Sequence, residues 1–417
     1  MRTNKLSLSI ITAAFALSSG TADATNGYFR LGYSANSIAM GGASTASAQD
    51  AMAGASNPAL ALNIDTTYTA AISAFSPDRG FTVEGGNPMT AMPGEFALTP
   101  QDTRSESDWF FIPSFGYKTD LNDDLALNVN LYANGGMNTD YDESVFYAGE
   151  TGVDLSQVFL NTSFAYKVSE NTNIGVAPII GYQRFKAKGL GSFAGFSQDP
   201  NAVSDNGYDS ATGYGARIGA FHQLNESWAF GASYQTEIKF DEFDKYKGLF
   251  AEDGGFNVPE TYNLGLEFSR SNYTVALDYQ RINYSDVQSV GNPMLPALMS
   301  SQLGTDGAAG FGWQDMDVIE LGFAIDGSSD NTYRFGVSYA EQPIPDSEVL
   351  FNILAPGVQE WHFTAGYEFG VDDVDYAFAL MYSPSKEVKG KNPLFPSQDQ
   401  QIELEMSQLE LTFGANF

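Results

Sequence analysis

The segment TYRFGVSYAE, residues 332–341, alternates between two kinds of side chain along its length. Tyr333, Phe335, Val337 and Tyr339 fall on one face of an extended chain, and mostly small or polar residues fall on the other. A period of two residues predicts a β-strand with one apolar and one polar face. The same pattern recurs in WHFTAGYEF (361–369), VDYAFALMYS (374–383) and QLELTFGANF (408–417).

Segments of this kind follow one another from about residue 65 to the end of the chain, and their connections alternate in length. The short connections are rich in Asn, Asp, Ser and Gly and lie at 120–123, 169–172, 225–227, 270–272, 327–331 and 371–373. The long ones lie near 76–106, 137–154, 188–210, 241–258, 286–312, 342–356 and 386–402. Short turns at one end and long loops at the other are typical of a transmembrane β-barrel. We therefore predict an all-β, antiparallel transmembrane barrel of about fourteen strands over residues 65–417.

A soluble β-sandwich or propeller would also contain alternating strands, but three features favour the barrel. The apolar faces are unusually rich in aromatic side chains. Trp109, Trp228 and Trp361 stand at the starts of strands, where barrels carry an interfacial aromatic girdle. The chain ends on Phe417, and a terminal aromatic residue on an amphipathic strand resembles the assembly signal of outer-membrane barrels.

The N-terminus has the three parts of a secretory signal peptide. Arg2 and Lys5 precede an apolar run at residues 6–17, and the small-x-small sequence Ala-Asp-Ala follows at 22–24. The alternative is a transmembrane helix, but the run is shorter than the roughly 20 residues that such a helix needs. We expect residues 1–24 to be removed on export.

Composition excludes several classes of function. The formal net charge is -31 and there is no cysteine. Nucleic acid is not an expected partner, because phosphate contacts need clustered Lys and Arg, and no disulfide or thiolate site can form. The two histidines, His222 and His362, lie apart, and neither a G-x-S-x-G nor an H-E-x-x-H motif occurs. We predict no enzyme activity, no cofactor and no specific metal site, although acidic groups could bridge to lipopolysaccharide through metal ions.

Residues 25–64 precede the first strand and follow neither a strand period nor a long helical one. Their centre, AMGGASTASAQDAMAGASNPAL (39–60), holds one charge and no aromatic residue. A barrel of about fourteen strands has a lumen wider than its own side chains fill. A small, neutral segment can fold inside that space, so we predict that residues 25–64 form a plug. The alternative is a disordered N-terminal linker.

The run NGYFRLGYSANSIAMGGASTASAQDAMAGASNPAL (26–60) resembles the N-terminal hatch of the FadL/TodX family, whose Asn-Pro-Ala motif matches Asn57, Pro58 and Ala59. The likeness continues in ESWAFGASYQTEIKF (226–240), VPETYNLGLEFSRSNYTVALDYQRINYSDVQ (258–288), YRFGVSYAEQPIP (333–345) and WHFTAGYEF. This resemblance implies a monomeric, fourteen-stranded, plugged transporter of long-chain fatty acids and other hydrophobic compounds. It would lie in the outer membrane of a Gram-negative bacterium, among membrane lipid and lipopolysaccharide, and release its substrate sideways.

Arg184, Lys186 and Lys188 form a basic cluster in a chain with few basic residues. The first two match basic positions on the corresponding strand of the family's fatty-acid transporters, so we predict that the cluster binds substrate, a carboxylate being held by charge-assisted hydrogen bonds. The alternative is that these cations neutralise carboxylates on adjacent strands. Another basic position of the family is occupied here by Trp313 and Gln314, which raises the prospect of an uncharged hydrocarbon as substrate.

In LALNVNLYANGGMNTDY (125–141) the alternation of apolar residues breaks before Gly135 and Gly136. Adjacent glycines in a strand indicate a bulge or kink, since both accept unusual backbone angles. The position matches the kinked strand by which the family is thought to release ligand, so we predict a lateral exit at these glycines. The alternative is that they begin the following loop.

These features predict a passive facilitator of hydrophobic molecules, either long-chain fatty acids or hydrocarbons. The alternative from another class is a surface receptor or adhesin, in which acidic external loops bind a partner and the barrel is only an anchor.

Overall fold

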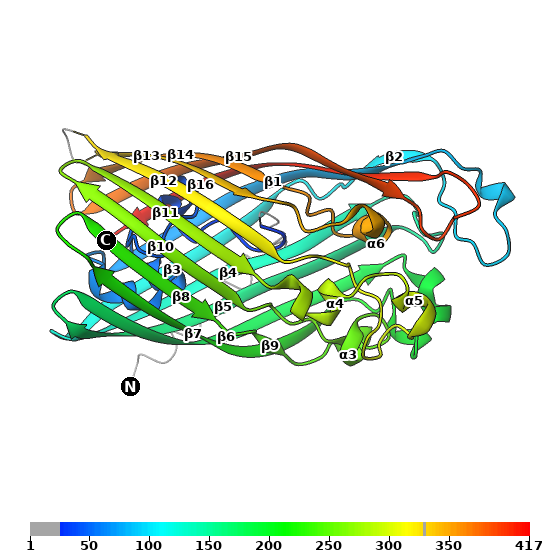
Figure 1. The fold of residues 1–417 in the computed structure, drawn as a ribbon, viewed down its shortest axis with the longest axis horizontal. Coiled ribbons are helices and arrows are strands. Elements are labelled where there is room, and N and C mark those ends of the chain that lie inside the picture. Colours follow the sequence, from blue (N-terminus) through cyan, green and yellow to red (C-terminus); the bar gives the residue numbers. More distant parts are fainter. Residues whose placement is uncertain (1–25, 328–330) are drawn as a thin grey trace.

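The computed structural model describes residues 26–327 and 331–417, so the predicted signal peptide, residues 1–24, lies outside the described residues. Fourteen antiparallel strands close into a barrel (Figure 1), in which β16 pairs with β1 along the whole of β1 from Thr69 to Glu84. The barrel strands are β1 (Tyr68–Glu84), β3 (Phe110–Asn122), β4 (Leu125–Tyr141), β5 (Thr151–Ser169), β6 (Thr172–Lys188), β7 (Asp209–Gln223), β8 (Trp228–Gln235), β10 (Thr261–Arg270), β11 (Tyr273–Ile282), β12 (Met316–Asp326), β13 (Asn331–Ala340), β14 (Trp361–Val371), β15 (Val374–Lys391) and β16 (Gln401–Asn416). The predicted all-β barrel of about fourteen strands is confirmed.

The remaining elements are short. Strand β2 (Gln101–Arg104) pairs with β1 and strand β9 (Lys239–Phe240) with β7, both outside the closed ring. Helical turns in the connections are η3 (Pro88–Thr90), η4 (Gly191–Phe196), η5 (Pro200–Ala202), η6 (Asp244–Tyr246), α3 (Ala251–Gly254), η7 (Tyr284–Asp286), α4 (Gln288–Gly291), α5 (Ala297–Ser300), η8 (Asp346–Glu348) and α6 (Val349–Asn352). Within the described residues, no helix has the length and apolarity to cross a membrane.

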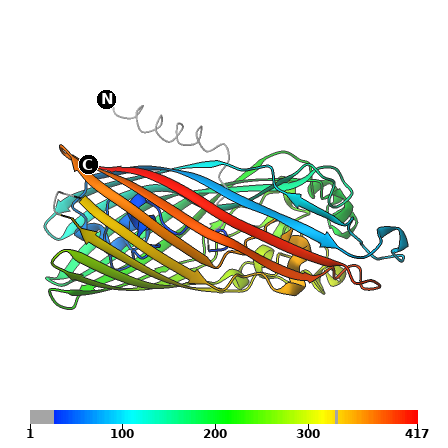
Figure 2. The same cartoon turned by 90° about the horizontal axis from the view of Figure 1, so that it is seen from above.

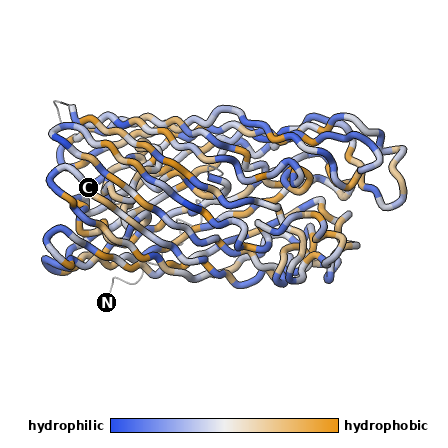
Figure 3. Tube along the Cα trace, viewed as in Figure 1, coloured by the Kyte–Doolittle hydropathy of each residue, from blue (hydrophilic) through white to orange (hydrophobic). Residues whose placement is uncertain are grey.

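The two ends of the barrel differ, and its outer face is apolar. Tight turns lie at one end, beside the C-terminus, and the long loops with helices α3 to α6 lie at the other (Figure 1). Hydrophobic and hydrophilic residues alternate along the strands (Figure 3), and outward side chains such as Ile72, Phe378 and Phe413 are more than 40% exposed. This is the surface that a lipid bilayer would cover.

Several strands run farther toward the loops than the sequence predicts. Strands β1, β4 and β15 continue to Glu84, Tyr141 and Lys391, into stretches where loops were expected. Near these ends Asp78, Asp140 and other polar residues face outward, so the apolar-out pattern of the membrane band is lost although the ladder of hydrogen bonds continues. The predicted loops at 76–106, 137–154 and 386–402 are therefore shorter than expected.

Residues 26–64, here called the inner segment, lie inside the barrel at the turn end (Figure 2). Helix α2 (Ala35–Ala39) contacts strands β13 to β16, whereas the turns η1 (Ala53–Ala55) and η2 (Pro58–Asn63) contact strands β4 to β7. The segment thus reaches opposite parts of the wall. Nearly all of its residues up to Ala61 are buried, which its small side chains allow.

The backbone of the inner segment touches the wall directly, because the wall presents glycine at the points of contact. A Cβ atom at Gly135 would overlap the carbonyl oxygen of Tyr28, and one at Gly219 would overlap the side chain of Asn57. Wall glycines whose missing Cβ leaves room for this segment are Gly116, Gly135, Gly175, Gly219, Gly231, Gly265, Gly322, Gly336, Gly366 and Gly414. A larger residue at these positions would push the inner segment away from the wall.

Polar wall residues hold the backbone of the inner segment in place. The carboxylate of Asp278 accepts hydrogen bonds from the N–H groups of Ser44 (2.9 Å) and Thr45 (2.7 Å). The amides of Asn128 and Asn130 donate to the carbonyl of residue 51, at 2.8 and 2.7 Å. Because a buried backbone group without a partner is costly, these wall side chains replace the partners that a helix or sheet would supply.

Asn57 connects the inner segment both to itself and to the wall. Its Nδ2 donates to the carbonyls of Thr45 (2.8 Å) and Ala220 in β7 (3.0 Å), and its Oδ1 accepts from the N–H of Ala59 (3.1 Å), capping η2. Pro58 follows at the first position of η2, where its missing N–H is no loss.

Replacing Asn57 by Ala should loosen the inner segment and leave the barrel folded, because three hydrogen bonds are lost while the strand ladders are untouched. We expect a local loss of about 1–3 kcal/mol, seen as faster proteolysis of residues 26–60 in the folded protein. The control is Asn63→Ala, which removes an exposed side chain with one wall bond, to Asn173. Equal protection in the two variants would contradict an anchoring role for Asn57.

Candidate functional site

The loop end of the barrel interior is filled with apolar, largely aromatic side chains. They enclose a cavity of about 50 Å³, the loop cavity, bounded by rings from β6, η4, α6 and two loops. Its aromatic lining consists of Phe185, Phe193, Phe250, Phe311 and Phe351. With Ser289 as the only polar side chain in the lining, this cavity offers burial and no hydrogen-bonding pattern, which suits a hydrophobic ligand.

An aromatic cluster connects the loop cavity to the inner segment. The ring of Trp313 is 5.2 Å from that of Tyr284 and 5.9 Å from that of Tyr28, and Phe311 links it to the loop cavity at 6.4 Å. The indole N–H of Trp313 donates to Asn352 Oδ1 (2.6 Å), which fixes the ring. Trp313 therefore presents an aromatic surface to the lumen at this point.

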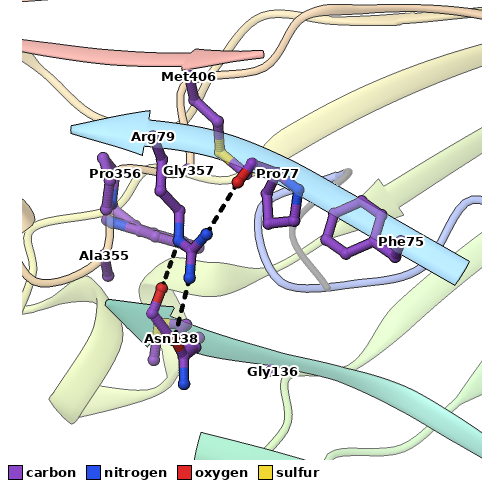
Figure 4. Close-up of a pocket in the computed structure, with 11 residues that line it drawn as sticks. Phe75, Pro77, Arg79, Gly136, Asn138, Ala355, Pro356, Gly357 and Met406 are labelled. Atoms are coloured by element: carbon purple, nitrogen blue, oxygen red, sulfur yellow. Dashed lines mark hydrogen bonds between the residues drawn. The ribbon is translucent and has the colours of Figure 1, made fainter. Parts of the chain in front are cut away.

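A second cavity, of about 20 Å³, lies where the lumen meets the wall (Figure 4). We call it the wall cavity. Trp313 and residues 355–357 line its lumen side, and Arg79 of β1 and Asn138 of β4 line its outer side. Because Phe311 neighbours Trp313 and Leu354 neighbours residue 355, the loop cavity and the wall cavity share one apolar partition.

The wall is interrupted beside this cavity. Strand β1 pairs with β3 only up to Phe75, and β3 pairs with β4 only up to Leu131. Beyond these points residues 76–79 pair with only one strand of the barrel, β16, and residues 133–141 with only one, β5. We call the interval between these two stretches the wall break.

Gly135 and Gly136, the predicted lateral exit, lie at the edge of the wall break. Strand β4 changes register against β5 between Ala133 and Gly135, as a β-bulge does. Gly135 forms a bridge with Phe29 of the inner segment, and Gly136 lines the wall cavity. The strand then continues to Tyr141, so the glycines lie within a strand and do not begin a loop.

Arg79 spans the wall break from β1 to β4 (Figure 4). Its Nε and Nη2 donate to the carbonyl (2.6 Å) and Oδ1 (2.9 Å) of Asn138, and its Nη1 donates to the carbonyls of Pro77 (3.0 Å) and Ser107 (2.9 Å). Sequence reasoning missed Arg79, because the sequence predicts a loop near residues 76–106. A signal was present, since basic residues are scarce in this chain.

Residues 105–109, between β2 and β3, cover the outside of the break. The N–H of Glu106 donates to the carbonyl of Asp140 (2.8 Å), and the N–H of Asp140 donates to Ser105 Oγ (3.0 Å). The N–H of Ser105 also donates to the carbonyl of Arg79 (2.9 Å). Residues 105–109, here called the strap, thus replace the missing strand ladder with a few hydrogen bonds.

The predicted substrate-binding cations lie outside the barrel. Arg184, Lys186 and Lys188 occupy alternate positions of β6 on the same face as Ile180, which is 46% exposed, whereas Phe185 between them points into the lumen. All three line an outer cavity of about 550 Å³, which also borders Asn138 at the wall break.

The three cations have different surroundings. Lys188 forms ion pairs with Asp140 (2.6 Å) and Glu150 (3.0 Å), as the neutralisation alternative expects. Arg184 and Lys186 lie over the ring of Tyr208, at 4.8 and 5.0 Å from its centre. Their heads therefore line an open cavity beside the break.

Tyr208 is itself held beside these cations. Burial, with the hydrogen bond from its hydroxyl to Asp154 as the second cause, raises the pKa of the Tyr208 phenol. The phenol therefore remains a neutral donor at physiological pH, and its ring face stays available to Arg184 and Lys186. Among the described residues, no group of three or more His, Asp or Glu side chains is arranged to hold a metal ion.

Comparison with known proteins gives a consistent result. The family described as "Outer membrane protein transport protein (OMPP1/FadL/TodX)" matches residues 20–417. A long-chain fatty acid transport protein of Escherichia coli is 21% identical over 378 residues, covering 80% of this chain and 81% of that protein. Outer membrane protein P1 of Haemophilus influenzae is 26% identical over 167 residues, covering 32% of this chain and 35% of that protein.

Two solved structures share the fold. The Pseudomonas putida toluene transporter TodX superposes with a TM-score of 0.66 at 18% identity, covering 94% of this chain and 99% of that one. A Pseudomonas aeruginosa FadL homologue also gives 0.66, at 14% identity, covering 94% of this chain and 98% of that one.

Replacing Gly135 by Ala should displace residues 26–30, because the new Cβ would overlap the carbonyl oxygen of Tyr28. We expect a loss of about 1–3 kcal/mol from overpacking and easier proteolysis of the N-terminal end of the inner segment. Gly136→Ala is the matched control, since Gly136 borders the wall cavity. Identical protease protection in both variants would show that the Gly135 contact is dispensable.

Proposed function

This chain belongs to the outer membrane protein transport family (OMPP1/FadL/TodX), and on that premise we propose that it is a passive facilitator that takes up hydrophobic molecules and releases them sideways into the membrane. It lies in the outer membrane of a Gram-negative bacterium as a β-barrel. In this proposal one chain forms the whole conduit, acts as a monomer, and performs no chemistry on what it carries.

The arrangement of three cavities carries the proposal. The loop cavity, the wall cavity and the outer cavity follow one another from the external loops to the outside of the wall break. The inner segment occupies the lumen on the turn side of the aromatic cluster, so we infer that it acts as a plug and closes the straight route. A hydrophobic molecule entering among the loops would then leave through the wall, toward the membrane.

The driving force in this proposal is the removal of apolar surface from water. Each buried methylene contributes about 0.8 kcal/mol, so a long chain gains several kcal/mol on entering a lumen lined by aromatic rings, and the bilayer interior offers the same gain. Movement from loops to bilayer is therefore downhill without a cofactor or another energy source. Both cavities on the lumen side are small, so loops and wall must move to admit a substrate.

Long-chain fatty acids and hydrocarbons both fit this mechanism. The ring faces of Trp313 and Phe311 can contact either an alkyl chain or an aromatic ring. For a fatty acid, we propose that Arg184 and Lys186 bind the carboxylate on the outer side of the wall break, as the chain leaves.

Cells with and without the gene should differ in uptake of labelled oleate or toluene; equal uptake would favour a receptor or adhesin instead.

Linking the strap to β4 should block lateral release. In this cysteine-free chain, Glu106→Cys with Asp140→Cys joins positions whose backbones are already hydrogen-bonded, so a disulfide can form between them. We expect uptake to fall to the level of cells without the protein when the pair is oxidised, and to return on reduction.

The matched control is Arg281→Cys with Asp317→Cys, a directly opposed pair in the continuous β11–β12 ladder. Its oxidation should leave uptake unchanged. Full uptake by the oxidised Glu106–Asp140 variant would exclude the wall break as the exit.

Replacing Arg184 and Lys186 together by Ala should weaken binding of oleate and spare toluene. We expect a loss of about 1 kcal/mol per cation, since water screens these half-buried charges. Lys239→Ala is the control for loss of an exposed positive charge elsewhere on the surface. Equal losses for oleate and toluene would mean that the two cations are structural.

A further inference from the structure

Arg79 is a buried cation whose hydrogen-bond partners are all neutral. Its exposed fraction is 3%, and its four hydrogen bonds go to three backbone carbonyls and one side-chain amide oxygen. Arg30 and Arg334, which are also buried, each form an ion pair with a glutamate, at 2.5 and 3.2 Å. Within residues 26–327 and 331–417, Arg79 takes part in no ion pair. Its positive charge is therefore not paired directly with a carboxylate, although Asp78, Asp108 and Asp140 lie near enough to attract it through space.

The guanidinium lies at the end of an apolar path. The wall cavity places it opposite Trp313 and Met406, and Phe110 lies beneath it, with 5.5 Å from the guanidinium carbon to the ring centre. An extended apolar chain resting on Trp313 would bring its end group to Arg79 before it reached the outer cavity. The lining around that end group holds the guanidinium as its one charge, because Asp78, Asp108 and Asp140, which act on Arg79 electrostatically, are not part of it.

We propose that Arg79 is a carboxylate-binding site at the wall break, selecting hydrophobic carboxylic acids, and that binding releases the bonds by which Arg79 joins β1 to β4. This inference rests on the proposed lateral route and names the substrate class that the route favours. It is distinct from the site at Arg184 and Lys186, which lies on the outer side of the same break.

Exchanging the bonds from Arg79 to Asn138 for bonds to a carboxylate is favourable, because the carboxylate carries a charge and the acceptors on Asn138 do not. A carboxylate can accept two parallel N–H bonds from a guanidinium, and such charge-assisted bonds are about twice as strong as bonds to neutral acceptors. The bonds given up, to the carbonyl and side-chain oxygens of Asn138, are neutral. A hydrocarbon or an alcohol offers no anionic acceptor, so it would leave the link between Arg79 and Asn138 intact.

Charges of both signs at the outer cavity act on the carboxylate once it has bound Arg79. Asp108 and Asp140 border the outer cavity and would repel an anion, whereas Arg184 and Lys186 would attract it. Lys188 is already paired with Asp140 and Glu150, so it neutralises part of the acidic rim. The carboxylate is then passed between two cationic positions across the wall break.

The first experiment compares binding of oleate and oleyl alcohol, which share one chain and differ in the end group, to the purified full-length protein at neutral pH. The wild type should bind oleate about tenfold or more tightly than the alcohol. Arg79→Gln should lose that preference while keeping its affinity for the alcohol, and Arg79→Lys should keep part of it. Arg104→Gln, which removes an exposed arginine of β2 paired with Glu405, should behave as the wild type.

The second experiment follows the opening itself. Gly136→Cys places a single thiol beside the wall cavity in a chain without other cysteines. A water-soluble thiol reagent should label it several-fold faster when oleate is bound than when oleyl alcohol is bound. Adding Arg79→Gln should make labelling fast without any ligand, because the link across the break is gone.

The outcomes separate this inference from the proposed function. If the wild type binds neither ligand, the transport proposal fails. If it binds both with equal affinity, or if Arg79→Gln weakens both equally, the carboxylate site is overturned while the transport proposal stands. If Arg79→Gln does not fold, which altered mobility of the unheated protein on a gel would reveal, Arg79→Lys decides the point: a preference for oleate as large as that of the wild type overturns the carboxylate site.

Discussion

The structure depends on direct contact between the backbone of the inner segment and the wall of the barrel. Side chains alone would keep the two too far apart for hydrogen bonds between them, but glycine in the wall and small residues in the segment remove that obstacle. Asp278 and Asn57 then bond backbone groups across the contact. The composition of residues 39–60, with one charge and no aromatic ring, follows from this geometry: any larger residue would have to find room in a wall already in contact.

The period of two was sufficient to predict the barrel, because a strand with one face in lipid and one in the lumen must alternate. The same period also predicts which way each side chain points, toward the lumen or toward the lipid, in β6 as in the other strands. Arg184, Lys186 and Lys188 share parity with Ile180, a lipid-facing residue, and Phe185 has the opposite parity. Their outward position could therefore have been read from the sequence, whereas their resemblance to ligand-binding positions of the family pointed to the lumen.

The wall break could not be derived in the same way. Whether a strand is paired on both sides depends on segments distant in the sequence. The local pattern of residues 76–79 or 133–141 therefore does not show that a neighbouring strand is missing. Pro77 and Gly135 were visible as irregularities, yet each has ordinary uses in a strand. Arg79 was hidden for a further reason: its partners are backbone carbonyls and an amide, which leave no charge pattern in a sequence.

The bulge in β4 shifts the phase of the strand. Below it, the even-numbered Asn128 and Asn130 face the lumen and bond the inner segment; above it, the odd-numbered Met137 and Tyr141 face the lumen among apolar residues. Without the extra residue, Asn138 and Asp140 would point inward and Met137 and Tyr141 would point into lipid. The bulge thus lets one strand present polar side chains to the inner segment and apolar side chains to the loop end of the same lumen. The number of residues in β4 between Ala133 and Gly135 is therefore constrained more tightly than the identity of most of its side chains.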